Sequence, residues 1–292
     1  MFIISRNFFC LLAVVVMFVS CSKEESLITG NEAPEDPTVS TLVKENYVRK
    51  SHLNLLGRQP VDSELLAAYS ILDKDNCSGQ SRNLFIGQLL GSAEYRAQLY
   101  NIENADLLNG VSDSELEQEV TYFQNQLNDP SNADDYVIIR EKLRKSILLQ
   151  SLKEDMISGA VNLRTAHMII TDTPLYEGIS GGDQEWVKAI FSHFLYREPT
   201  ENELENCTEM MSNQPQTLFF TEGSSRDDLI SIFFSSQEYN EGQVRKLYRN
   251  YLFREPGADE MAFLSGLYSQ ENNYPALQKG IMTNDEFMGL KN

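Results

Sequence analysis

The sequence has few of the residues that usually carry chemistry, with three histidines, four cysteines and one tryptophan among 292 residues. It has no His-Glu-x-x-His, no two histidines four residues apart and no Cys-x-x-Cys, the spacings that typically hold zinc. Residues 178–182, Gly-Ile-Ser-Gly-Gly, fit the Gly-x-Ser-x-Gly pattern, but Ser180 lacks the preceding strand that a hydrolase nucleophile turn requires. The sequence has no Walker-type phosphate loop. We therefore expect no metal, no cofactor and no enzymatic activity.

Positive charge is scarce as well. The chain has 24 lysines and arginines against 43 aspartates and glutamates, which gives a formal net charge of −19. Binding to a nucleic-acid backbone needs clustered lysine and arginine, so we expect no nucleic-acid partner. A large negative charge helps to keep an exported protein soluble.

Long apolar runs are missing except at the N-terminus. Arg6 is followed by an apolar run over residues 8–19, which is short for a membrane span and typical of a secretory signal. We predict a signal peptide over residues 1–20, lipidation of Cys21, and a flexible tether over residues 21–43, which are rich in Glu, Ser, Thr and Pro. The alternative is an ordinary secretory signal with an incidental cysteine at position 21.

The residues around Cys21 resemble the lipobox of bacterial lipoproteins, although Phe18 stands where leucine is usual. The stretch Ser-Lys-Glu-Glu at 22–25 is similar to the signal that sends lipoproteins of Bacteroides-like bacteria to the cell surface. The resemblance implies a protein anchored by its N-terminal lipid in the outer membrane and facing the cell surface.

From residue 44 onward, apolar residues recur at helical spacing, which predicts an all-α protein. A pattern that begins at Val48, Val187 and Val244 occurs three times in register. Each copy has a basic residue after the valine, a ring four positions on, and an Arg-x-Pro-x3-Glu motif. The arginine and glutamate pairs are Arg58 and Glu64, Arg197 and Glu203, and Arg254 and Glu260.

The Arg-x-Pro-x3-Glu motif predicts a corner between two helices of a helical hairpin. Proline ends the first helix, so the arginine falls in its last turn and the glutamate in the first turn of the next helix. The two side chains are then close enough to pair across the corner. Thr200 and Glu203 have the spacing of a capping box, whereas Val61 is a poor cap and Asp62 is expected to replace it. We interpret the motif as structural.

Each copy continues into a second amphipathic helix. We expect this helix to end in an acidic–aromatic signature, Ser/Asn-x-Glu-aromatic, at 92–95, 236–239 and 284–287. The stretch 110–116, Gly-Val-Ser-Asp-Ser-Glu-Leu, is interpreted as a degenerate corner. Residues 173–183 are rich in Gly and Pro and predict a linker or an exposed loop. We therefore predict two helical lobes, an N-terminal domain over 44–175 and a C-terminal domain over 183–292.

The repeat resembles the helical repeat of phycobilisome-linker-like domains, through "VRKLYRNYLFREPGADEMAFLSGLY" and the later "NDEF". The first copy also resembles a domain of unknown function in large surface proteins of planctomycetes. These resemblances cover residues 44–100 and 186–290, and they imply a structural or adhesive role without a shared catalytic site.

Single residues outside the motif favour packing over chemistry. His52 occupies the ring position of the first copy, and Cys207 occupies a position that is Ala68 or Leu264 in the other copies. Both are expected in the core, and a disulfide between Cys77 and Cys207 is left open. The remaining histidines, His167 and His193, have no neighbouring motif. We predict an exposed binding face that includes Tyr196, Phe219, Phe220 and Tyr274.

These observations favour a non-catalytic outer-membrane lipoprotein that acts as a structural or protein-interaction module, with a protein of the envelope or cell surface as its partner. One alternative is a glycan- or nutrient-binding accessory lipoprotein of an outer-membrane transporter. A second is a hydrolase with an unrecognised carboxylate site, because 43 acidic residues offer many pairs.

Overall fold

The computed structural model describes residues 38–290, so the predicted signal peptide, Cys21 and nearly all of the predicted tether lie outside the described residues. The described part contains fifteen α-helices and one two-stranded sheet, which confirms the all-α prediction. No helix in residues 38–290 is both long enough and apolar enough to cross a membrane.

The first copy of the repeat forms three helices around one corner. A serine or glycine stands at most helix boundaries here, as expected for caps. The elements are α2 (Thr41–Leu56), α3 (Asp62–Leu72), the 3-10 turn η2 (Asp73–Asp75), α4 (Gly79–Leu90) and the following helix α5 (Ala93–Leu108).

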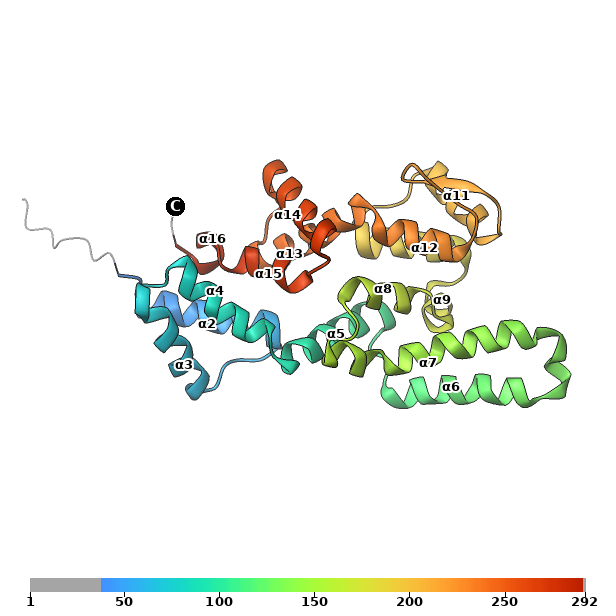
Figure 1. Cartoon of the computed structure of the whole chain (residues 1–292), viewed down its shortest axis with the longest axis horizontal. Helices are drawn as coiled ribbons and strands as arrows, with labels where there is room; N and C mark the ends of the chain where they lie inside the picture. The colour runs from blue at the N-terminus through green and yellow to red at the C-terminus, as the bar shows by residue number, and fades with distance from the viewer. Residues whose placement is uncertain (1–37, 291–292) are drawn as a thin grey trace, which may run out of the picture. The chain divides into compact units, whose positions relative to one another are not determined.

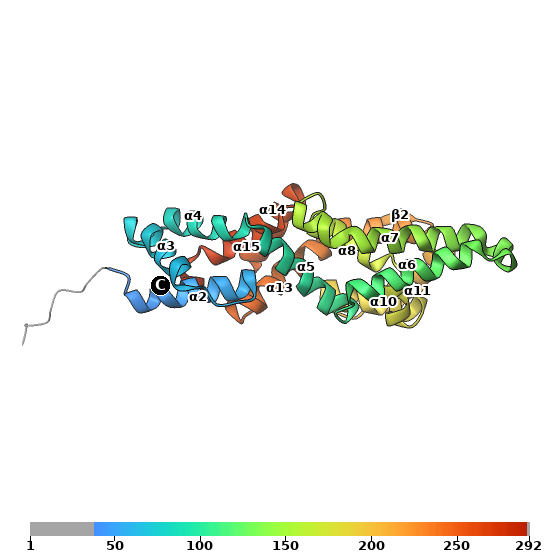
Figure 2. The same ribbon diagram turned by 90° about the horizontal axis from the view of Figure 1, so that it is seen from below.

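The middle of the chain is dominated by a long antiparallel helical hairpin, which projects as α6 and α7 in Figures 1 and 2. The two helices are joined by a short 3-10 segment that begins at a proline. The elements are α6 (Asp113–Asn128), η3 (Pro130–Asp135), α7 (Tyr136–Ser158), α8 (Leu163–Thr171) and α9 (Pro174–Ser180).

The second copy differs from the first in two ways: its corner helix ends in a π-helical turn, and a β-hairpin is inserted after its second helix. Its elements are α10 (Asp183–Ile190), the π turn η4 (Phe191–Leu195), α11 (Glu201–Met211), β1 (Gln216–Leu218), β2 (Thr221–Gly223) and α12 (Arg226–Ser235). The strands are antiparallel, with Leu218 opposite Thr221.

The third copy overlaps the second, because one helix serves both. The helix α13 (Gln237–Leu252) begins with the acidic–aromatic signature of the second copy and carries the valine of the third. It is followed by α14 (Ala258–Glu271), α15 (Tyr274–Met282) and α16 (Asp285–Met288).

The prediction of a linker over residues 173–183 is wrong for most of its length. Thr173 caps α9 by accepting a hydrogen bond from the backbone of Tyr176, and Pro174 takes the first helical position, where its missing N–H costs nothing. Tyr176 is fully buried. Only the Gly181-Gly182 pair, both residues with positive φ, forms a connection to α10.

The acidic–aromatic signatures were expected at helix ends, and the structure places them at helix starts. Ser92, Ser236 and Asn284 are the N-caps of α5, α13 and α16, and each accepts a hydrogen bond from the backbone three residues on. A short oxygen-bearing side chain is well suited to this position, because it satisfies a backbone N–H that has no helical partner.

The first and last helices of the described chain lie side by side (Figure 1). The Tyr47 hydroxyl on α2 donates a hydrogen bond to the Met282 carbonyl at 3.1 Å, and Lys50 Nζ lies 4.0 Å from the centre of the Phe287 ring. Residues 39–290 lie in one compact unit. Within it, α2 packs against α16, and α4 packs against α15.

The π turn of the second copy lies against α13 at very short range. A Cβ atom on Gly242 would lie 1.8 Å from the Phe194 carbonyl oxygen, closer than any real contact. Only glycine therefore allows the two backbones to approach this closely. This contact fixes the second corner relative to the third.

Candidate functional site

The three predicted arginine–glutamate pairs are formed, and their geometry is the same in each copy. Arg58 donates from both Nη atoms to the two carboxylate oxygens of Glu64, each at 2.8 Å. The matching distances are 2.8 and 2.7 Å from Arg197 to Glu203 and from Arg254 to Glu260. Each pair is thus bidentate, the geometry that suits a planar guanidinium.

Each corner arginine also binds a second glutamate that the sequence reasoning missed. Arg58 binds Glu94, Arg197 binds Glu238 and Arg254 binds Glu286, with N–O distances of 2.5 to 2.9 Å. These glutamates belong to the acidic–aromatic signatures. The glutamate that recurs in those signatures was therefore the sequence signal for a second partner. Each corner links three helices instead of two.

The corner arginines lie just outside their helices, which corrects the prediction that they occupy the last turn. Gly57, Tyr196 and Phe253 directly precede them and adopt left-handed φ values of 70, 59 and 56 degrees. A residue in this conformation cannot continue a right-handed helix, so it ends the helix before the proline is reached.

The corner glutamates complete the caps of the following helices. Glu64 accepts a hydrogen bond from the backbone N–H of Val61 at 2.8 Å, which makes Val61 the N-cap residue, and the prediction that Asp62 takes this role is wrong. Thr200 caps α11 with its hydroxyl, as predicted. Hydrogen bonds from Arg58 hold the pKa of Glu64 at about 2, so the carboxylate stays ionised at neutral pH.

The stretch 110–116 keeps the cap of a corner without its arginine. Asn109 ends α5 in the left-handed conformation, and Ser112 forms a capping box with Glu115. Glu115 bonds to the backbone and the hydroxyl of Ser112 instead of to an arginine. This arrangement agrees with the interpretation of a degenerate corner.

The single residues expected in the core are found there. His52 is 2% exposed, and its Nδ1 lies 2.9 Å from the Val48 carbonyl oxygen. Cys77 and Cys207 are both buried and both free, so they do not form a disulfide. Burial raises the pKa of the Cys207 thiol to about 12, which leaves it protonated and unreactive at neutral pH.

A buried polar cluster joins three helices that lie far apart in the sequence. It contains Glu103 on α5, His167 on α8, and Lys246 and Tyr239 on α13. Glu103 lies 2.9 Å from Lys246 Nζ and 3.0 Å from His167 Nε2, and His167 Nδ1 lies 2.9 Å from the Tyr239 hydroxyl. The side chains of Glu103 and His167 are only 2% and 1% exposed.

The charges of this cluster compensate one another. Burial alone would raise the pKa of Glu103, but Lys246 and His167 bring it down to about 2. Burial lowers the pKa of His167, which favours the neutral ring. A carboxylate only accepts hydrogen bonds, so Nε2 carries the proton and Nδ1 accepts from Tyr239. Tyr239 is fully buried, so the chain of hydrogen bonds ends in the core instead of at an exposed nucleophile.

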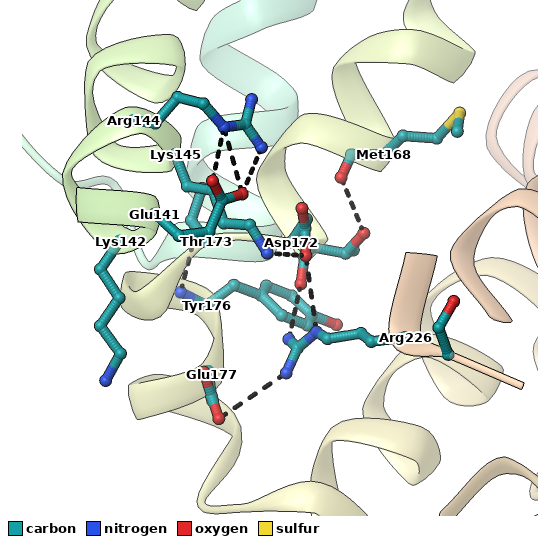
Figure 3. Close-up of polar contacts among 12 residues, drawn as sticks. Glu141, Lys142, Arg144, Lys145, Met168, Asp172, Thr173, Tyr176, Glu177 and Arg226 are labelled. Atoms are coloured by element: carbon teal, nitrogen blue, oxygen red, sulfur yellow. Dashed lines mark hydrogen bonds and ion pairs between the residues drawn. The ribbon is translucent and has the colours of Figure 1, made fainter. Parts of the chain in front are cut away.

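A second charged cluster joins α7, α8, α9 and α12, as Figure 3 shows. Asp172 lies 2.7 Å from Lys145 Nζ and 3.5 Å from Arg226 Nε. The guanidinium of Arg226 also lies 4.6 Å from the centre of the Trp186 ring. Burial raises the pKa of Asp172, and the two cations oppose this effect.

Beside this cluster, the start of α7 exposes large apolar side chains. Tyr136, Val137 and Ile138 are 49%, 68% and 57% exposed. Val137 and Ile138 line a pocket of about 340 Å³ together with Pro174 on α9. We call this surface the α7 face, defined by Tyr136, Val137, Ile138 and Pro174.

The aromatic residues predicted to be exposed have different positions in the structure. Phe220 is fully exposed, whereas Tyr196 and Phe219 are half-buried. Tyr274 is 4% exposed, so its place in a binding face is wrong; it forms the first turn of α15 and packs in the core against Tyr268.

Within residues 38–290, no group of three or more His, Cys, Asp or Glu side chains is arranged to hold a metal ion. Comparison with protein-family models, curated proteins and solved structures finds no match for the chain.

Proposed function

We propose that this protein is a non-catalytic interaction module, held at the outer membrane by a lipid on Cys21, which binds a protein partner through the α7 face. The observation that carries the proposal is the exposed Tyr136, Val137 and Ile138 beside a pocket. An exposed apolar group of this kind, rimmed by polar residues, is typical of protein-interaction sites.

The charge around the α7 face indicates the kind of partner. Residues 140–145 read Arg-Glu-Lys-Leu-Arg-Lys, a basic run in a chain with an excess of acidic residues. Arg144 is paired with Glu141, and Lys145 with Asp172. Arg140 and Lys142 have no ion-pair partner within the described part of the chain, and Lys142 points away from the cluster in Figure 3. We infer a partner segment with apolar anchors and acidic neighbours.

The non-catalytic assignment is supported by the roles that the structure gives to the motif residues. Arg58, Arg197 and Arg254 are engaged in helix corners. His167, which hydrogen-bonds to the carboxylate of Glu103, is 1% exposed, and its other ring nitrogen bonds to the buried Tyr239. Contacts within the fold therefore account for both arrangements.

A photo-crosslinking amino acid at position 137, introduced in the organism that makes the protein, tests the α7 face. We expect one discrete crosslinked protein. The yield should fall at least tenfold when Lys142→Glu is added, because the inferred partner is acidic. The matched controls are the same crosslinker at Leu66, which is 69% exposed on α3, and Lys74→Glu on η2. An equal crosslinking yield at Leu66 would contradict a specific binding site. A product of twice the chain's mass would indicate a second copy of this chain instead of a different partner protein.

The proposed location at the cell surface and the lipid anchor are tested separately. Protease added to intact cells should remove the protein, and Cys21→Ser should move it from the membrane fraction to the soluble fraction. Full resistance to protease in intact cells would contradict exposure at the cell surface. Membrane retention of the Cys21→Ser variant would contradict the lipid anchor.

A further inference from the structure

The inserted β-hairpin distinguishes the second copy of the repeat from the other two. In the first copy, α3 is joined to α4 through the 3-10 turn η2, and in the third copy only residues 272–273 separate α14 from α15. The second copy has β1 and β2 at the same place. In repeat proteins, insertions specific to one copy are often found on the binding face.

The turn of this hairpin has an unfavourable sequence for its conformation. Phe219 and Phe220 are the two residues between the strands, and both have positive φ, at 48 and 65 degrees. Two-residue hairpin turns in which both residues have positive φ favour Asn-Gly, because most other residues are strained at positive φ. Phe219 gains from packing, since its ring lies 6.1 Å from that of Phe191. Phe220 is fully exposed, so the fold does not explain its presence.

A pocket of about 490 Å³ opens beside this turn. Phe219, Phe220 and Ile232 supply apolar surface, and Ser231, Ser235 and Glu238 supply polar groups. Ser231 and Ser235 are one turn apart on α12, and neither hydroxyl has a hydrogen-bond partner among residues 38–290. The volume is in the range of small-molecule sites.

The carboxylate of Glu238 is used differently from its counterparts. Arg58 bonds to both oxygens of Glu94, and Arg254 bonds to both oxygens of Glu286. At the second corner, both bonds from Arg197 go to Oε2 of Glu238, at 2.9 and 2.6 Å. Oε1 of Glu238 therefore has no partner within the described chain and remains an acceptor at the pocket.

The charge of the pocket restricts the ligand. Glu238 is the one charged side chain among the described residues that line it, and Arg197 already compensates that carboxylate. Charged ligands thus find no free counter-charge. An uncharged ligand with hydroxyl groups and an apolar face matches the lining, because hydroxyls can donate to Glu238 and pair with the two serines.

We propose that this pocket binds a sugar unit of an uncharged glycan, with Phe220 stacked on the apolar face of the ring and Glu238 accepting a hydroxyl proton in a hydrogen bond. This goes beyond the interaction role of the α7 face, because the pocket is formed by other elements and takes another class of ligand. The strained Phe220 is then retained for binding.

The test uses the full lipoprotein in detergent on an array of neutral, sialylated and sulfated oligosaccharides. We expect binding to neutral glycans, with a loss of at least tenfold in the Phe220→Gly variant. Glycine suits positive φ, so this variant should keep or raise the melting temperature. Loss of binding without loss of stability separates a ligand contact from a structural role. The matched control is Phe263→Gly on α14, another exposed phenylalanine, which should keep full binding.

A second variant, Glu238→Gln, should also reduce binding, whereas Glu94→Gln at the equivalent place in the first corner should not. Several results would overturn the proposal. These are an array without signal, binding confined to charged glycans, unchanged binding by Phe220→Gly, or Phe220-dependent binding to lipid vesicles or to a protein instead of a glycan.

Discussion

At the three corners, the arginine side chains are 33 to 38% exposed, whereas Glu103 and His167 in the buried cluster are 2% and 1% exposed. Both arrangements pair charges across helices. The corners do so where water screens the charges and each group has alternative solvation, so the loss of one partner is tolerable. In the cluster, the loss of one partner leaves a charge in the core. The cost in stability of losing one partner of a charge pair therefore depends on how deeply the pair is buried.

The comparison also separates repeated from unrepeated features. The corners occur three times and define the architecture, whereas the buried cluster occurs once and ties α5, α8 and α13 together. The predictions below test whether burial decides the size of each effect.

The largest effect is expected at the buried cluster. Lys246→Ala leaves the carboxylate of Glu103 buried without its cation and should lower the free energy of unfolding by about 3–5 kcal/mol. The measurement is urea-induced unfolding followed by circular dichroism. The double variant Glu103→Leu with Lys246→Met should recover much of the loss, because it removes both charges. A loss below about 1 kcal/mol for Lys246→Ala, as for an exposed pair, would contradict the inference that burial makes the loss of a charge partner costly.

A smaller effect is expected at a corner. Arg197→Ala should lower the free energy of unfolding by about 1–3 kcal/mol, because the hydrogen bonds to Glu203 and Glu238 are lost. Arg197→Lys should restore little, since an ammonium cannot make the bidentate pair. The same unfolding measurement applies. If Arg197→Ala folds as stably as the wild type but loses a binding partner, the corner has a functional role instead of a structural one.

Acid should weaken the corners through their glutamates. Hydrogen bonds from Arg58 and Arg254 hold the pKa values of Glu64 and Glu260 at about 2, against 4.5 for the unperturbed side chain. Their stabilisation is therefore complete above about pH 4.5 and is lost as the pH falls toward 2. Glu64→Gln should show a smaller loss of stability over this range than the wild type. Glu117→Gln, at an exposed residue of α6, is the control and should keep the wild-type acid dependence.

The smallest effect is expected from the caps, where the copies differ. Thr200 caps α11 with its hydroxyl, but Val61 makes no side-chain hydrogen bond at the start of α3. Thr200→Ala should cost about 0.5–2 kcal/mol, and Val61→Thr should stabilise the chain by a similar or smaller amount. Thermal unfolding of both variants measures the difference. A destabilising Val61→Thr would show that the first corner does not have the geometry of the second.

The sequence predicted the local part of the corners, because Arg and Glu stand six residues apart and recur in register. It did not predict Glu94, Glu238 and Glu286 as second partners, since these follow 32 to 41 residues later, after loops of different length. It also missed the left-handed Tyr196 and Phe253, because aromatic residues are not typical of that conformation.

The buried cluster was outside the reach of pattern analysis. His167 and Glu103 are 64 residues apart, and Lys246 is 143 residues from Glu103. Neither His167 nor Glu103 belongs to a motif, so only the packing of α5, α8 and α13 brings the cluster together. The linker prediction at 173–183 failed for a related reason. A Gly- and Pro-rich composition does not reveal that Thr173 and Pro174 start a helix whose Tyr176 is buried.

The packing of α2 against α16 has a consequence for the order in which the chain folds. A polypeptide emerges with its N-terminus first, so Tyr47 and Lys50 are made more than 230 residues before their partners Met282 and Phe287. The helices α3, α4 and α5 can cover part of α2 early, but the part that packs against α15 and α16 stays uncovered until they appear and is open to chaperones or to misassembly. Completion of the native core therefore waits for α15 and α16, and a truncation before α16 would expose part of α2.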